Sequence, residues 1–156
     1  MTFKDELVEI LQAELECLEA IKELSYAKTD LVIKNQVEEL EEITNKEVEL
    51  INQVANLERD RLDLFNTWGV DVNLSLSHII DKIPEDKEDL LELADQLKSL
   101  LKDIQVRNNM NRELIEDNIQ WVEFNMNMIT QAATPATYDK KNKDSKAGRT
   151  IFDRKV

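Results

Sequence analysis

The residues that most often carry enzyme chemistry are scarce in this sequence. His78 is the only histidine and Cys17 is the only cysteine, so a histidine pair, a histidine-based metal site and an intrachain disulfide are all excluded within one chain. A two-iron helical bundle needs Glu-x-x-His on two helices, but Ser75 stands three residues before His78. The sequence contains no glycine-rich phosphate loop, and nothing places a serine, a histidine and an aspartate as a triad. We therefore expect no enzyme, no metal and no cofactor.

Hydrogen-bonding residues do recur with a regular spacing, in the stretch NNMNRELIEDNIQWVEFNMNMI at residues 108–129. Asn111, Asn118 and Asn125 lie seven residues apart, so a helix would present them on one face. A polar group on an apolar seam costs free energy unless it finds a partner. We therefore predict that this seam receives another helix. The seam contains three apolar pairs: Leu114 with Ile115, Trp121 with Val122, and Met128 with Ile129.

The composition favours helices as the elements that hold this stretch in place. The chain of 156 residues is 42% hydrophobic and 34% charged, with only two glycines and two prolines, which is typical of long helices and coiled coils. The length suits about one domain. The net charge is −13; residues 138–156 hold seven basic and three acidic residues, a net +4, so the rest carries −17. Because such a body would repel phosphates, we expect no nucleic acid partner.

The chain shows no signal for a membrane or for an oxidising compartment. The first residues lack an apolar run of signal-peptide length, and no apolar stretch is long enough to cross a bilayer. We expect a cytoplasmic protein without direct membrane insertion. Cys17 lies between Leu15 and Leu18, which predicts a buried, unreactive thiol.

Four helices are expected, at about residues 3–33, 36–67, 75–83 and 85–131. Asn35, with Glu38 three residues later, fits the N-cap of the second helix. Ser75 or Ser77 would cap the short third helix, and Pro84 suits the start of the last one. The first two helices predict an antiparallel hairpin; the alternative is one long helix that pairs between chains.

The expected fold is all-α, an elongated three- or four-helix coiled-coil bundle at 1–131, followed by a flexible, disordered basic tail at 132–156. A last helix of about 47 residues would be roughly 70 Å long, against roughly 46 Å for each hairpin helix. Part of it therefore lacks a partner within the chain, unless the short helix occupies the difference. Near the end of the tail, Ile151 and Phe152 stand among basic residues, as in a short binding motif or a segment that folds back onto the bundle.

The whole chain resembles the FlgN-like family of flagellar export chaperones. The resemblance rests on the acidic hairpin, on LSHIIDKIPEDKEDLLELADQLKSLLKDIQ, on NNMNRELIEDNIQWVEF, and on the ending IFDRKV. It implies a chaperone that binds the terminal helix of hook–filament junction proteins, prevents their premature assembly and delivers them to the export apparatus. It also implies contact with the export gate through a tyrosine beyond the last helix, a place that Tyr138 occupies here.

The resemblance places the substrate-protein site on the distal part of the last helix. The alternative within the bundle is that the same stripe forms its third wall. An alternative from another class is a coiled-coil adaptor that dimerises through this seam, whereas the chaperone is expected to be a monomer or a weak homodimer. The implied site residues are Leu114, Ile115, Asn118, Trp121, Val122, Phe124, Asn125, Met128 and Ile129.

Overall fold

Four helices make up the part of the chain that the computed structural model describes, residues 1–131. They are α1 (Phe3–Ile33), α2 (Val37–Thr67), α3 (Leu76–Asp81) and α4 (Glu88–Gln131). No strand occurs within these residues, which confirms the all-α helical bundle. The expectations for the tail, including the role of Tyr138 and of the ending IFDRKV, lie outside the described residues.

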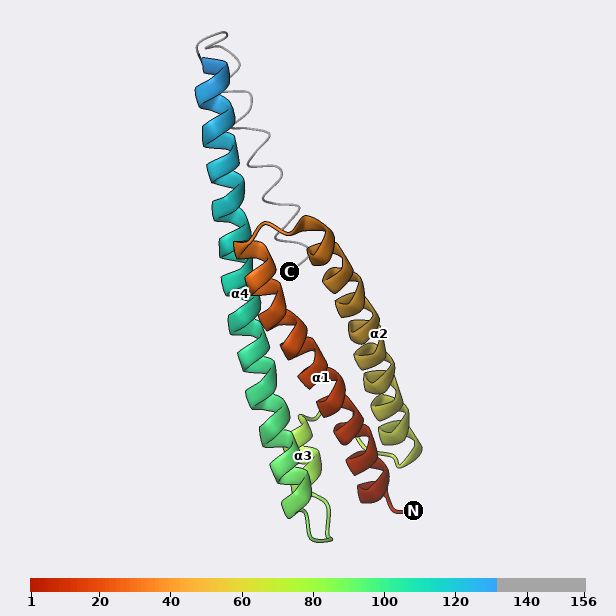
Figure 1. Ribbon diagram of the computed structural model, residues 1–156. Helices are drawn as coiled ribbons and strands as arrows, with labels where there is room; N and C mark the ends of the chain where they lie inside the picture. The colour runs from red at the N-terminus through yellow and green to blue at the C-terminus, as the bar shows by residue number, and fades with distance from the viewer. Residues whose placement is uncertain (132–156) are drawn as a thin grey trace.

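The helices α1 and α2 form the predicted antiparallel hairpin (Figure 1). Two ion pairs join them along its length: Arg61 Nη1 lies 2.9 Å from Glu14 Oε2, and Lys28 Nζ lies 3.2 Å from Glu47 Oε1. Along α2, apolar residues repeat at heptad spacing from Leu40 to Leu64, and Glu47 and Arg61 interrupt this repeat. Each interruption therefore faces an opposite charge on α1.

The last helix runs parallel to α1 and starts at the same end of the bundle (Figure 1). Lys4, in the first turn of α1, lies 3.3 Å from Asp89, in the first turn of α4. Near the end of α1, Thr29 hydrogen-bonds to Asn111. The central helix α1 packs against both α2 and α4, whereas no Cα pair brings α2 and α4 within 8 Å of each other in the described chain. The bundle is therefore open between α2 and α4.

The turn between α1 and α2 corrects the prediction that Asn35 caps α2. Asn35 has a φ of 55°, and its N–H donates to the carbonyl of Val32 while the N–H of Gln36 donates to that of Leu31. This is a Schellman motif, in which asparagine tolerates the left-handed conformation that ends a helix. Gln36 is the N-cap residue of α2, one residue later than expected, and makes no side-chain cap bond.

Two further helix ends, the end of α3 and the start of α4, differ from the expected ones by two or three residues. Of the two candidate caps for α3, Ser75 is the N-cap residue, and its hydroxyl accepts from the N–H of His78. The helix α3 ends at Asp81 rather than at 83. The last helix begins at Glu88 rather than at 85. The carboxylate of Asp86 accepts from the N–H of Glu88, so this acid, and not Pro84, organises the start of α4.

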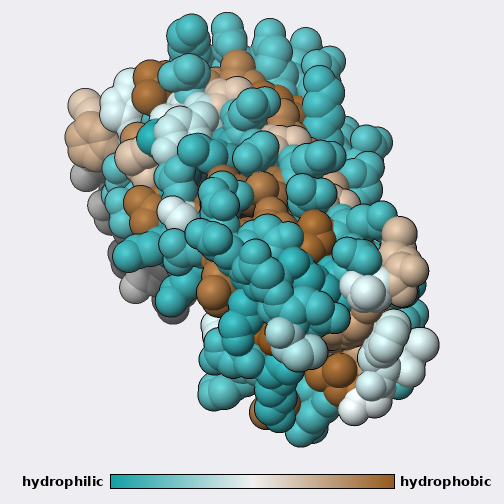
Figure 2. Space-filling model, turned by 90° about the horizontal axis from the view of Figure 1, so that it is seen from below, coloured by the Kyte–Doolittle hydropathy of each residue, from teal (hydrophilic) through white to brown (hydrophobic). Residues whose placement is uncertain are grey.

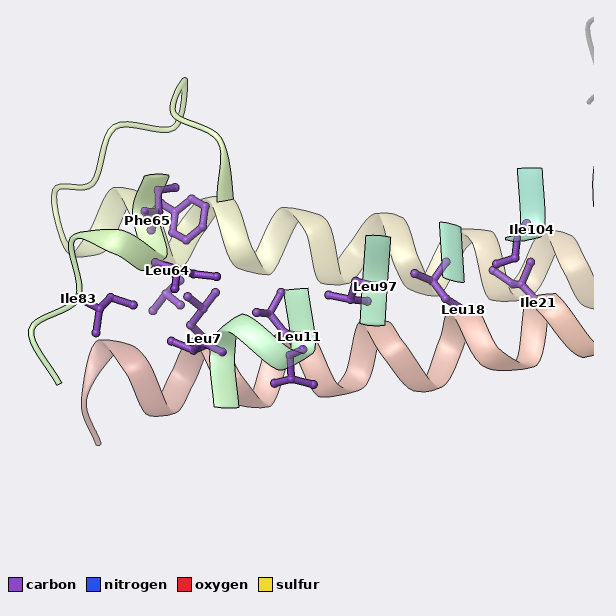
Figure 3. Close-up of a cluster of buried hydrophobic side chains, with 13 residues drawn as sticks. Leu7, Leu11, Leu18, Ile21, Leu64, Phe65, Ile83, Leu97 and Ile104 are labelled. Carbon is purple, nitrogen blue, oxygen red and sulfur yellow. The ribbon is translucent and has the colours of Figure 1, made fainter. Parts of the chain in front are cut away.

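The apolar core is concentrated at the end of the bundle where α1 and α4 begin. Leu7, Leu11, Leu64, Phe65 and Ile83 meet there, at one end of the cluster in Figure 3. The cluster then narrows along α1 and α4 and ends at Ile21 and Ile104. Figure 2, which views the molecule from below, shows hydrophobic patches within a mainly hydrophilic surface. The far half of the α1–α4 interface therefore depends on other interactions.

Cys17 is only partly buried, which corrects the expectation of a buried thiol. Its Sγ lies 3.5 Å from Oε1 of Gln53 on α2. Desolvation, together with the negative charges of Glu16 and Glu14, raises the pKa of the thiol. A raised pKa keeps the sulfur protonated and unreactive.

Candidate functional site on the distal part of α4

One heptad position of α4 changes from apolar to polar halfway along the helix. The first three residues at this position are buried in the core. The next three are asparagines, so the continuing interface must satisfy amide groups instead of burying methyl groups. The series is Leu90, Leu97, Ile104, Asn111, Asn118 and Asn125.

Asn111 is fully enclosed between α1 and α4, with 3% of its surface exposed. Its Nδ2 donates to the carbonyl of Ser25 at 2.9 Å, and its Oδ1 accepts from the hydroxyl of Thr29. The hydroxyl of Ser25 in turn donates to Oδ1 of Asn108 at 3.1 Å. These four residues form a polar layer that fixes the register of α4 on α1, because a shift of one residue would leave buried groups unpaired.

Asn118 lies where α1 ends. Its Nδ2 donates to the carbonyl of Val32 at 3.1 Å and to Oδ1 of Asn35 at 3.3 Å. The Val32 carbonyl, in the last turn of α1, already accepts from the N–H of Asn35, so this amide adds a second bond to it from α4. Asn118 therefore marks the last level at which α1 supports α4.

Asn125 has no helix beside it among the described residues. Its Nδ2 donates at 2.7 Å to the carbonyl of Trp121, four residues earlier on the same helix. The seam predicted from the asparagine spacing thus has two parts: Asn111 and Asn118 pair with α1, and Asn125 lies beyond it.

A charged cluster on the neighbouring face also holds α4 against α1. The hydroxyl of Tyr26 donates to Asp103 at 2.8 Å, and Lys22 lies 3.1 Å from the same carboxylate. The Tyr26 hydrogen bond and then Lys22 keep the pKa of Asp103 below its usual range. Arg107 lies over the Tyr26 ring, 3.8 Å from its centroid, in a cation–π contact.

Beyond Asn118, the last 13 residues of α4 project past the hairpin by about 20 Å. The short helix α3 does not cover them, because it packs beside the start of α4 at the opposite end (Figure 1). Apart from Ile119, which is partly buried, the large apolar side chains on this projection are exposed, with Trp121 at 66%, Phe124 at 62% and Ile129 at 78%. Val122 and Met128 are exposed as well. We call residues 119–131 the distal segment.

A groove of ≈ 450 Å³ lies between the distal half of α4 and the turn from α1 to α2. We call it the corner groove. Most of its lining is apolar, and Ile115, Asn118 and Val122 line it from α4. From the hairpin it is lined by Leu31, Val32, Asn35, Gln36, Val37 and Leu40, and α4 adds Ile119 and Glu123.

The structure places the predicted site residues in two groups. Leu114, Ile115 and Asn118 are partly buried at the level where α1 ends, and Ile115 and Asn118 line the corner groove. Asn125 is partly buried beyond that level. The exposed apolar face of the distal segment holds Trp121, Val122, Phe124, Met128 and Ile129.

Sequence reasoning missed the wall of the corner groove that the hairpin supplies. Val37 and Leu40, three residues apart at the start of α2, and Leu31 near the end of α1 line this wall. Val37 is 71% exposed; in the sequence, an apolar residue directly before the acidic start of the second helix is a signal that could have been used. Their proximity to α4 required knowing that α4 runs parallel to α1.

Two other kinds of site, a metal site and a membrane-spanning helix, can be assessed for residues 1–131. No group of three or more histidine, cysteine, aspartate or glutamate side chains in this part of the chain could hold a metal ion. None of its helices has the length and hydropathy needed to cross a membrane.

Comparison with known proteins agrees with the resemblance noted from the sequence. The family model described as FlgN protein matches residues 1–146. The chain is also similar to an uncharacterized protein of Bacillus subtilis (strain 168), YvyG, with 29% identity over 122 residues, which cover 77% of this chain and 76% of the relative. No solved structure matches. Because the family model matches nearly the whole chain and the structure is a helical bundle, the chain belongs to the FlgN family of flagellar export chaperones.

Proposed function

We propose that this chaperone binds the terminal helix of a hook–filament junction protein along the distal part of α4. In this proposal the client helix packs on Trp121, Val122, Phe124, Met128 and Ile129. Ile115 extends the contact into the corner groove, and Leu114 extends it toward the level where α1 ends. Asn118 and Asn125 would set its register. The chaperone would act in the cytoplasm, keep the client from assembling early and deliver it to the export apparatus.

The observation that carries the proposal is the length of α4 beyond α1. Six large apolar side chains of the distal segment are about half exposed or more, and no described helix covers them. Contiguous exposed apolar surface marks an interaction site in a soluble protein. An amphipathic client helix laid along this face would bury it as a helix-in-groove complex.

The side chains on this face suit a client of variable shape. Met126 and Met128 are both exposed, and methionine adapts its three rotatable bonds to different partners. Trp121 and Phe124 provide large, stiff anchors of the kind that dominate binding free energy. The negative charge of the chain keeps such a surface dispersed in solution.

Delivery to the export gate rests on the family alone. Tyr138 holds the place of the tyrosine that the resemblance assigns to gate contact, but it lies outside the described residues. We keep this contact as a prediction, to be tested by Tyr138→Ala, which should preserve client binding and reduce client export.

Client binding is tested by isothermal titration with a purified junction protein. Trp121→Ala and Phe124→Ala should each weaken binding by at least about 30-fold, the loss expected for a hot-spot residue of about 2 kcal/mol or more. Both side chains are more than half exposed, so urea unfolding should change by less than about 0.5 kcal/mol. Ile51→Ala, at a comparably exposed position on α2, is the matched control and should bind normally.

The coiled-coil adaptor gives the opposite result in the same samples. If binding survives both aromatic substitutions, the distal segment is not the client site. If the chain is an obligate dimer by light scattering and Trp121→Ala makes it a monomer, the seam serves self-association.

A further inference from the structure

We propose that residues 149–156 of this same chain, RTIFDRKV, occupy the corner groove when no client is bound. The segment holds Ile151, Phe152 and Val156 as apolar anchors, together with three basic residues and one acidic residue. The structure describes the groove but not this segment, so the inference rests on apolarity, charge and reach. Only its consequence for client binding rests on the function proposed above.

The groove offers a place for a short apolar segment. Its volume is ≈ 450 Å³, within the range of sites that hold small ligands or a few side chains. Val37 is largely exposed and Val122 about half exposed on its two sides. A Phe152 ring between these walls would cover surface that neither helix of the hairpin covers.

Charge favours this segment over a second copy of the body. The start of α2 reads VEELEE, with Glu38, Glu39, Glu41 and Glu42 all exposed, and Glu116 and Asp117 lie on α4 at the level of the groove. A segment with a net charge of +2 is attracted to this rim, whereas the net −17 of residues 1–137 opposes the approach of a second body.

The connection has the right length. Ile119, near the middle of the groove on α4, precedes Gln131 by 12 residues, or about 18 Å along the helix. The 17 residues at 132–148 would span roughly 23 Å as a flexible coil. Because the two lengths match, the effective concentration of the segment at the groove would be on the order of 1 mM.

This arrangement would make the segment a competitor of the client. Ile115, Asn118 and Val122 belong both to the groove and to the proposed client face. A segment that covers the groove about three-quarters of the time leaves about one quarter of the chains free to bind, which lowers client affinity roughly fourfold. The groove would therefore stay covered until a tighter ligand arrives.

Photo-cross-linking in the full chain tests the docking. A benzophenone amino acid replaces Phe152, and the control chain carries it at Lys143 in the polar spacer. At nanomolar dilution, Phe152 should yield cross-links within one chain to Val37, Leu40 or Val122, which 0.5 M salt should reduce, and Lys143 should not. The proposal would be overturned by equal cross-link patterns from both positions, by the absence of cross-links, or by products that join two chains. It would also be overturned by cross-links to the ≈ 660 Å³ pocket around Trp68 at the opposite end of the bundle.

Competition is measured separately, by titrating a junction protein into the full chain and into its Phe152→Ala variant. The variant should bind roughly fourfold more tightly, and Lys143→Ala should bind like the parent chain. Equal affinities would refute the competition. If neither protein binds the client while the cross-links persist, the proposed client is wrong and the docking stands.

Discussion

The three asparagines at one heptad position of α4 should respond differently to the same substitution. Asn111→Ala removes two hydrogen bonds that are buried between α1 and α4. At about 0.5–1.5 kcal/mol for each bond, with a small void added and about 0.5 kcal/mol regained from the helix propensity of alanine, the unfolding free energy should fall by about 2 kcal/mol.

The other two positions serve as internal controls. Asn118→Ala loses its bond to the Val32 carbonyl at a partly exposed site, so we expect a loss of about 0.5 kcal/mol. Among residues 1–131, Asn125 bonds only within its own helix, where alanine is the better helix former. Asn125→Ala should therefore be neutral or stabilise the protein by a few tenths of a kcal/mol.

The assay is urea unfolding followed by circular dichroism, with a common m-value for all variants. A double-mutant cycle between Asn111→Ala and Thr29→Val should show a coupling of at least about 0.5 kcal/mol, because the two side chains share a bond. Equal losses at Asn111 and Asn125, or a cycle without coupling, would refute the polar layer as the element that sets the register of α4.

Three further changes test the hairpin. Arg61→Ala leaves the buried Glu14 carboxylate without its partner and should lower the unfolding free energy by about 2 kcal/mol; no loss would mean that the ion pair is not formed in solution. Burial raises the pKa of Glu14 above its usual 4.5, and the charge of Arg61 only partly offsets this effect. The folded state therefore binds the proton more tightly than the unfolded state does. As a result, the free energy of unfolding falls as the pH rises from 4.5 through the raised pKa. Glu14→Gln should remove this decline in urea titrations between pH 4.5 and 7, and an unchanged profile would contradict the raised pKa. Gly69→Ala should lower the unfolding free energy by about 1 kcal/mol, because Gly69 has a φ of 69°, which alanine adopts only with strain. No steric cost is added, since a Cβ at this position would meet nothing within 4 Å. A larger loss in thermal melts would point to a clash that the structure does not show.

Most of the fold could be predicted from spacing, because the hairpin and the long last helix repeat apolar residues every three or four positions. The end of α1 could not be placed from residue types alone. Asn35 suits both an N-cap and a left-handed helix end, and only the backbone conformation, with a φ of 55°, distinguishes them. The start of α4 was ambiguous for a similar reason, since Pro84 and Asp86 both fit the beginning of a helix.

The candidate site was predicted in part. Heptad spacing identified Asn111, Asn118 and Asn125 as one face, and the length of α4 predicted that part of it would lack a partner. The sequence did not show that Asn111 pairs with α1 while Asn125 does not, because that depends on where α1 ends beside α4. The ion pairs of Arg61 and Glu47 could have been found, since Glu14 and Lys28 lie at the matching heptad position of α1.

The parallel pairing of α1 with α4 has a consequence for how the chain folds. The hydrogen bonds between these helices join residues 77 to 86 positions apart, whereas the hairpin closes through a three-residue turn. Short loops close faster than long ones, so we expect the hairpin to form before α4 docks. The core around Leu7 and Leu11 is complete only after α4 has packed against the hairpin. We therefore expect docking of α4 to be the slower step, beginning at the apolar end of the bundle.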